Sequence, residues 1–167
     1  GGLMAGVDAH SFRPRLHRWR LDLATGRVTE TRLDDRTLEF GTIDQRRAGR
    51  PSRYRYSATL PPGRFLMDGL VKHDLETGRS DAFAFGPGRF GSEAPFAPRR
   101  GGTEEDDGYL VSFVTDLAED RSECVVLDAR DLAAGPVCRI LLPHRISSGT
   151  HAWWADGASL ETPGGRP

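Results

Sequence analysis

The sequence predicts an all-β fold, and three of its features indicate this. Helical periodicity is nearly absent from the 167 residues, short apolar runs alternate with turn signals, and one hairpin pattern recurs along the chain. Hydrophobic residues make up 37% and charged residues 28%, which is typical of a globular domain with its own core. We expect one domain over residues 1–167, with a disordered tail at 158–167 that is rich in Gly and Pro.

The recurring pattern is a strand, a turn of the type Asp-Leu-x-Thr-Gly and a second strand. Gly at the end of this turn supplies the positive φ that a tight hairpin needs. A third copy is degraded, and successive copies start about 50 residues apart, close to the length of a propeller blade. The three turns lie at residues 22–26, 74–78 and 131–135.

Hairpins that repeat at this period are typical of the blades of a β-propeller. A chain of this length makes roughly three blades, whereas propellers close with about four to eight. Three blades alone would leave open strand edges, so we expect the chain to be part of a larger propeller. Two alternatives remain open from the residues: a small β-sandwich with two similar hairpins, and a chance recurrence of the turn.

Composition narrows the partners and the compartment. A net charge of -1 gives no reason to expect nucleic acid. No apolar run approaches the roughly 20 residues of a membrane helix, and no signal peptide is evident. The chain opens with Gly1 and Gly2, so we expect its natural N-terminus to be missing. Cys124 and Cys138 lie in apolar stretches as free thiols, which favours a reducing cytoplasm.

Two charged features have competing explanations. Lys72 is the only lysine among 23 basic residues, and the others are arginines. This bias indicates a GC-rich genome. The alternative is a functional arginine patch, either at Arg46, Arg47 and Arg50 or at Arg99 and Arg100. The acidic run at 104–108 lacks the ligand spacing of an EF-hand loop. It therefore predicts a solvated turn ahead of a strand at 109–114.

No local catalytic motif is present, so any site must be assembled from distant strands. His17 and His73 occupy matching places in two hairpins and are expected on strand surfaces or in packing. His10 and His144 carry no signal of ligation. His151 stands between small residues and two tryptophans, a setting that fits a buried structural histidine as well as a metal ligand.

Two glutamates could support such a histidine. Glu39 stands beside Phe40 after a strand, and Glu93 lies in an apolar stretch bounded by Gly and Pro. A buried carboxylate needs a partner, and a histidine N–H behind a metal would serve. Taken alone, the residues favour a solvated loop glutamate at each position.

Five stretches in order resemble the carotenoid cleavage oxygenases, the family that includes lignostilbene dioxygenases and the retinal pigment epithelium isomerase. The resemblance runs from about Leu16 to about Gly157. The most specific part is GRFGSEAPFAP followed by EDDGYLVSF. The stretches are Leu16 to Gly26, Leu38 to Pro51, Gly88 to Pro98, Glu105 to Phe113 and Pro143 to Trp153.

This resemblance implies a seven-bladed β-propeller with an Fe(2+) ion on its axis, held by four histidines that three glutamates brace. His151 matches one ligand, and Glu93 and Glu39 match two of the glutamates. Glu93 would brace His151, and Glu39 would brace a histidine that this chain lacks. The other three ligands would lie upstream, which makes this chain a C-terminal portion that is inactive by itself.

The implied reaction is oxidative cleavage of a carotenoid or apocarotenoid double bond by O2, which gives two carbonyl products without an organic cofactor. The substrate would be a hydrophobic polyene or stilbene, extracted through peripheral membrane contact. Lignostilbene-type cleavage and a non-catalytic binding propeller are the alternatives. The chain departs from the family at Ser147, Ser148 and Thr150, which would reshape the substrate tunnel, at Ala152 in place of Gly, and at Gly41-Thr42 in place of a Pro-containing pair.

Overall fold

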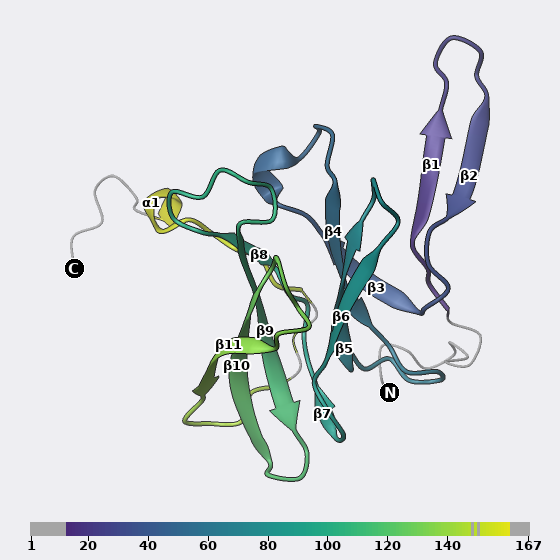
Figure 1. Ribbon diagram of the computed structural model, residues 1–167. Coiled ribbons are helices and arrows are strands. Elements are labelled where there is room, and N and C mark those ends of the chain that lie inside the picture. Colours follow the sequence, from purple (N-terminus) through teal and green to yellow (C-terminus); the bar gives the residue numbers. More distant parts are fainter. Residues whose placement is uncertain (1–12, 148, 150, 161–167) are drawn as a thin grey trace.

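The computed structural model describes residues 13–147, 149 and 151–160, and this part of the chain is all-β apart from two short helices (Figure 1). The strands form three antiparallel sheets, which we call the β1–β2 hairpin, the β3–β6 sheet and the β7–β11 sheet. The hairpin pairs β1 (His17–Leu21) with β2 (Val28–Arg32). The β3–β6 sheet runs in the order β3 (Leu38–Thr42), β4 (Tyr54–Thr59), β5 (Gly69–Asp74) and β6 (Ser80–Ala84).

The β7–β11 sheet is built around its longest strand. It runs in the order β11 (Pro136–Leu141), β10 (Arg121–Asp128), β9 (Gly108–Asp116) and β7 (Arg89–Phe90), and β8 (Phe96–Pro98) also pairs with β9. The helices are a 3-10 turn, η1 (Gln45–Arg47), and α1 (Gly157–Leu160). The predicted tail begins within α1, and its remainder at 161–167 lies outside the described residues.

The three predicted repeats are three hairpins in three different sheets. Gly26, Gly78 and Gly135 end their turns with φ of +71°, +72° and +81°. In the first two turns the leading aspartate accepts backbone N–H groups two and three residues further on. This shared geometry explains why the Asp-to-Gly pattern recurs, and it excludes a chance recurrence of letters.

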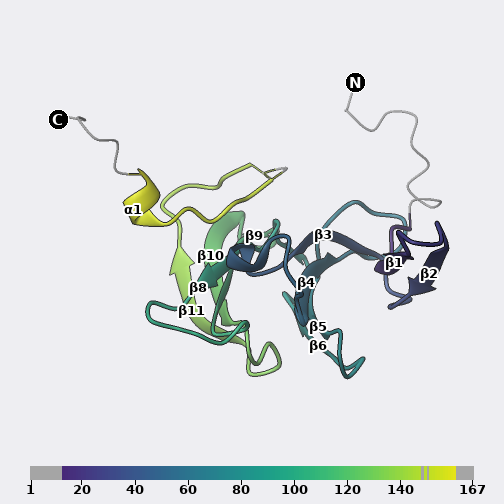
Figure 2. The ribbon, with the colours of Figure 1, turned by 90° about the horizontal axis from the view of Figure 1, so that it is seen from above.

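The core lies between the two larger sheets, which stand side by side in both ribbon views (Figures 1 and 2). Tyr56 and Leu70 face Leu110, Val125 and Leu127, and each of these side chains is at most 1% exposed. In β9 the even-numbered residues are buried, as the alternation of side chains along a strand requires. The Tyr56 hydroxyl donates to the carbonyl of Ala129, so the polar tip of this core residue is satisfied.

The acidic run at 104–108 is not the solvated turn that we predicted. Glu105 accepts three hydrogen bonds from the β3–β6 side, from the Ser52 hydroxyl and from the backbone N–H groups of Arg53 and Tyr54, at 2.7–2.8 Å. Its side chain is only 10% exposed. The run therefore connects the start of β4 to the start of β9 through hydrogen bonds, because backbone N–H groups that are removed from water need an acceptor.

The single lysine contributes to the same junction. The Lys72 ammonium lies 2.6 Å from an Asp106 carboxylate oxygen and over the ring of Tyr54, 4.3 Å from its centroid. Lys72 is buried, so the ion pair and the cation–π contact are what offset the desolvation of its charge. These two contacts explain how a lysine can be buried at this position, in a chain whose other cationic side chains are arginines.

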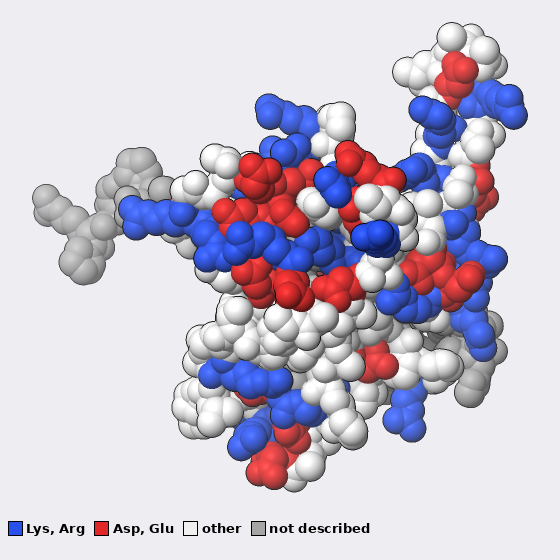
Figure 3. All heavy atoms as spheres, viewed as in Figure 1, with Lys and Arg blue, Asp and Glu red and all other residues white. Residues whose placement is uncertain are grey.

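Three of the five clustered arginines are paired with acidic residues. Arg46 binds Asp44, Arg47 lies 3.5 Å from Glu105, and Arg99 binds Asp107. Figure 3 shows acidic and basic side chains intermingled across the upper half of the face, with no region of one sign. This arrangement disfavours the arginine-patch hypothesis.

A buried network attaches the β1–β2 hairpin's linker to the β3–β6 sheet. Asp34 accepts from the Arg36 guanidinium and lies 2.6 Å from Nε2 of His73, a buried residue of β5. Burial alone would raise the pKa of Asp34, but the hydrogen bonds from Arg36 and His73 outweigh it and hold the pKa well below the ordinary 3.8. This carboxylate is therefore a source of pH-dependent stability.

Neither cysteine of the described chain is in a disulfide; Cys124 is buried and Cys138 is exposed. Among the described residues, no helix has the length and apolar character needed to cross a membrane.

We expect Glu105→Ala to lower the free energy of unfolding by about 2 to 4 kcal/mol, because two part-buried backbone N–H groups lose their acceptor. Chemical denaturation of the chain measures this change. Glu104→Ala is the matched control, since Glu104 is exposed, and it should change stability by less than about 0.5 kcal/mol. Equal effects of the two substitutions would contradict the bridging role of Glu105.

We expect stability to fall on acidification partly through Asp34. A carboxyl whose folded pKa is depressed contributes stability that is present above its unfolded pKa of 3.8 and is lost as the pH falls toward its folded pKa. Asp34→Asn should therefore flatten the loss of stability between roughly pH 5 and pH 2. Urea midpoints across this range test it, with the exposed neighbour variant Asp35→Asn as the control that keeps the wild-type slope.

Candidate metal-ligand site

A single carboxylate holds the segment that carries His151. One oxygen of Glu93, Oε1, lies 2.8 Å from Nδ1 of His151, and the other, Oε2, accepts the backbone N–H of Ala152. The structure thus brings together the pair that the family resemblance implied. The Glu93 side chain is 14% exposed and the His151 side chain 76%, so the anchor is buried and the histidine projects from it.

Local sequence explains why Glu93 reaches this place. It belongs to the connection at 91–95, five residues that span four residues of β9 at 111–114, so the inner edge of the sheet bulges. Gly91 is required at the start, because a Cβ there would lie 2.4 Å from the Phe85 ring. Ser92 then fixes the connection by donating its N–H to the Ser112 hydroxyl and accepting the N–H of Phe113.

The contact decides which nitrogen of His151 is available. A carboxylate accepts a hydrogen bond from the Nδ1–H group, so in the neutral ring the lone pair is on Nε2, which points away from Glu93. A neutral imidazole with a carboxylate behind it is the usual ligand arrangement at metal sites. The donor set therefore fits one histidine ligand of a divalent metal, which would bind through Nε2.

Glu39 lies in the β3–β6 sheet, on the strand that approaches His151. Its Oε2 accepts the N–H of Phe40, and among the described residues it contacts no histidine. Phe40 links the two predicted glutamates, because its ring packs against the imidazole of His151 with centroids 5.7 Å apart. Two small cavities flank Phe40 and Gly41, one of about 150 Å³ beside Glu39 and one of about 170 Å³ beside Glu93.

The other histidines lie apart from this pair. His17 is exposed and binds Glu30 through Nδ1, His73 is buried against Asp34, and His144 is exposed. These positions agree with the surface and packing roles that we predicted. His10, Ser148 and Thr150 fall outside the described residues. Within the described ranges no group of three or more His, Cys, Asp or Glu side chains could hold a metal ion, so His151 stands there as a single candidate ligand.

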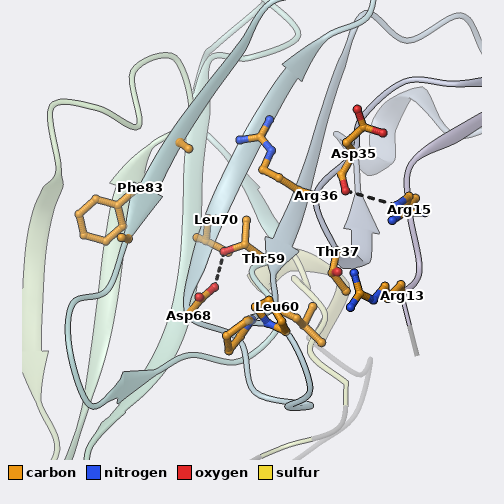
Figure 4. A pocket seen from close by; sticks show the side chains of 14 residues that line it. Arg13, Arg15, Asp35, Arg36, Thr37, Thr59, Leu60, Asp68, Leu70 and Phe83 are labelled. Atoms are coloured by element: carbon orange, nitrogen blue, oxygen red, sulfur yellow. Dashed lines mark hydrogen bonds between the residues drawn. The ribbon is translucent and has the colours of Figure 1, made fainter. Parts of the chain in front are cut away.

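A larger cavity of about 600 Å³ lies elsewhere, at one end of the β3–β6 sheet (Figure 4). Leu60, Leu70 and Phe83 give it an apolar part, and Asp68 within it accepts from the Thr59 hydroxyl at 2.6 Å. None of the three predicted site residues lines it. The cavity therefore does not belong to the candidate metal-ligand site.

Sequence reasoning missed Phe40 as a member of the site. The position of Phe40 directly after Glu39 could have suggested it, but nothing in the amino-acid sequence showed that the backbone changes direction there. Phe40 has φ +52°, a value that favours glycine and that bulky residues rarely adopt. Its ring also meets Phe65, at 5.9 Å between centroids, so an aromatic wall borders His151.

An all-β chain of repeated hairpin sheets, in which a glutamate of a bulged strand connection holds a histidine of a later segment, fits the metal-dependent propeller proteins as a class. Residues 4–156 match the family described as retinal pigment epithelial membrane protein. The chain belongs to this family, that of the carotenoid cleavage oxygenases, as its closely similar relatives also show.

Curated relatives include lignostilbene-alpha,beta-dioxygenase isozyme III of Sphingomonas paucimobilis, 36% identical over 93% of this chain and 35% of that protein. The carotenoid 9,10(9',10')-cleavage dioxygenase 1 of Pisum sativum is 34% identical over 90% of this chain and 30% of its own length. The apocarotenoid-15,15'-oxygenase of Synechocystis is 35% identical over 84% and 29%. This chain therefore spans about a third of the length of these relatives.

Solved structures agree with the sequence comparisons. The cobalt-substituted Synechocystis apocarotenoid oxygenase superposes with a TM-score of 0.83 at 33% identity, over 90% of this chain and 32% of that one. A chimera of that oxygenase and the retinal pigment epithelial protein gives 0.80 at 31% identity, over 86% and 30%. These structures are β-propellers, so the predicted fold class is confirmed and the β-sandwich alternative is excluded.

We expect the neutral His151 ring to carry its proton on Nδ1, because Glu93 accepts there. Long-range ¹H–¹⁵N spectra of the chain at high pH distinguish the two tautomers. Glu93→Ala should shift His151 to the Nε2–H form that is ordinary in water, while His17, which Glu30 holds through Nδ1, serves as the internal control. An Nε2–H tautomer of His151 in the unsubstituted chain would contradict the site as described.

Proposed function

We propose that this chain contributes to a non-haem iron(II) dioxygenase that cleaves a double bond of a carotenoid or apocarotenoid with O2 and gives two carbonyl products. The observation that carries the proposal is the Glu93 carboxylate on Nδ1 of His151, in a chain whose relatives include a carotenoid cleavage dioxygenase and an apocarotenoid oxygenase. The reaction balances without a further reductant, because both oxygen atoms of O2 enter the two carbonyl groups.

In this proposal the chain's residues hold and orient one ligand. Glu93 keeps a proton on Nδ1 of His151, which leaves Nε2 as the donor and raises its basicity. Glu39 would act in the same way on a histidine from outside this chain. The iron supplies the activation of O2 when it is bound. Phe40 and Phe65 form an apolar wall beside the ligand, which suits a flat conjugated hydrocarbon.

Two other functions have specific support. Cleavage of a stilbene is supported by the similarity to the Sphingomonas lignostilbene dioxygenase. A non-catalytic binding propeller is supported by the presence of one candidate ligand among the described residues. Turnover of a stilbene compared with an apocarotenoid separates the first alternative from the main proposal, and the absence of any stoichiometric metal in the complete protein would favour the second.

We also propose a cytoplasmic location and contact with a membrane surface that supplies the substrate. The free thiols of Cys124 and Cys138 support the first, because reducing compartments keep cysteines unpaired. The apolar character of a polyene supports the second.

The test uses a chimera in which this chain replaces the matching segment of the Synechocystis apocarotenoid oxygenase. We expect His151→Ala to abolish stoichiometric iron and turnover, and Glu93→Gln to weaken metal affinity by about 10- to 100-fold, as loss of a carboxylate behind a ligand does. Isothermal titration and product analysis measure these effects.

Glu104→Gln is the control for the chimera, since this exposed glutamate lies outside the site. The 167-residue chain alone should not retain iron through dialysis, because it offers one ligand. Full iron content and activity after His151→Ala would refute the assignment, and so would tight stoichiometric iron in the isolated chain.

A further inference from the structure

Phe40 has an unusual backbone conformation beside the candidate ligand. Its φ of +52° lies in the left-handed region, and among the described residues only Asp120 shares this feature without being glycine. Asp120 stands in an exposed turn, where such a conformation is easily tolerated. For a Phe within a strand it is strained, and strain of this kind concentrates at functional sites.

A bulge in β3 forces this conformation. Glu39 pairs with Ala58 and Thr42 pairs with Tyr56, so Phe40 and Gly41 together oppose a single residue of β4. Bulges of this kind redirect a side chain. The ring of Phe40 therefore departs from the regular alternation of side chains between the two faces of the strand.

The Arg55 side chain lies against the backbone of Gly41. A Cβ on Gly41 would lie 2.4 Å from a terminal nitrogen of the Arg55 guanidinium, so a larger residue there would displace the end of this side chain. The Nε of Arg55 is buried without a hydrogen-bond partner in the described part of the chain. Glycine at position 41 therefore leaves the guanidinium in its place beside the bulge.

The redirected ring meets the imidazole at nearly a right angle. The planes of Phe40 and His151 are inclined by 82° with centroids 5.7 Å apart, and Phe65 supports Phe40 from another direction at 74°. Edge-to-face contacts of this kind are favourable aromatic geometry. The hydrogen bond to Glu93 restrains His151 at Nδ1 but leaves the ring free to rock about that bond, whereas an aromatic ring packed across it restricts the rocking.

We propose that Phe40 is a positioning residue for His151, and that its left-handed bulge holds its ring against the imidazole so that Nε2 is aimed at the metal. The inference rests on the proposed function, because it assumes that His151 is a ligand. A glycine at position 40 would adopt the same φ without strain. Phenylalanine at this position supplies the ring contacts with His151, which glycine cannot supply.

The first readout is the imidazole of His151 in the metal-free 167-residue chain. The ring current of Phe40 should displace the His151 ring proton resonances, which are assigned by their loss in His151→Gln. Phe40→Leu, which is similar in bulk but has no aromatic ring, should remove the displacement, and Phe40→Tyr should preserve it. Unchanged His151 resonances in Phe40→Leu would overturn the contact itself.

The second readout is the dissociation constant for cobalt(II) in the Synechocystis chimera. We expect Phe40→Leu to weaken binding by about tenfold, the lower end of what supporting residues contribute, and Phe40→Tyr to restore it. Phe40→Gly relieves the backbone strain and removes the ring, so it should also bind about tenfold more weakly while keeping the bulge. Asp120→Gly, which relieves the same strain far from the site in sequence, should bind cobalt as the unsubstituted chimera does.

The outcomes separate this inference from the proposed function. If His151→Ala binds cobalt as tightly as the unsubstituted chimera, the proposed function fails. If His151→Ala weakens binding but Phe40→Leu and Phe40→Gly do not, only the positioning role of Phe40 is overturned. Equal weakening by Phe40→Leu and Phe40→Tyr would also overturn it, because the effect would then come from packing and not from the aromatic contact.

Discussion

The Glu93 carboxylate is the interaction on which the candidate site depends. The described residues between β11 and α1 include no strand, so among them no ladder of hydrogen bonds fixes His151. Glu93 substitutes for that ladder, with one oxygen on the side chain of His151 and the other on the next backbone N–H. Because the glutamate is largely shielded from solvent and comes from an edge of a sheet, it transfers the rigidity of the sheet to an otherwise irregular segment.

The two halves of the site come from different sheets, so the packing of these sheets sets its geometry. Glu93 belongs to the β7–β11 sheet, whereas Glu39 and Phe40 belong to the β3–β6 sheet. The core around Tyr56 and Leu110 holds the faces together, and Glu105 and Asp106 join the sheets through backbone donors and Lys72. An apolar core tolerates small sliding motions, but these directional polar contacts favour a single register between the sheets.

The sequence was sufficient for the fold class and for the pairing of Glu93 with His151, for different reasons. Hairpin turns are local, so the Asp and Gly that form them are visible as a repeated pattern. The Glu93–His151 pairing joins residues far apart in the chain, and it came from resemblance to a family and not from the letters themselves. The acidic run at 104–108 was wrongly predicted as solvated, because the hydrogen-bond donors at 52–54 that Glu105 accepts from are close to it only after two sheets have packed. The left-handed backbone of Phe40 was likewise hidden, since it accompanies the shift in register between β3 and β4.

The exposure of His151 has a physical meaning in such an arrangement. A metal ligand that is restrained on one side by Glu93 and Phe40 must leave its Nε2 side open, because the ion and the remaining ligands occupy that side. His151 is accordingly 76% exposed in a chain that spans about a third of its relatives. A buried carboxylate on Nδ1, an aromatic ring across the imidazole and an open Nε2 together distinguish His151 from His73, which lies buried within the sheet against Asp34.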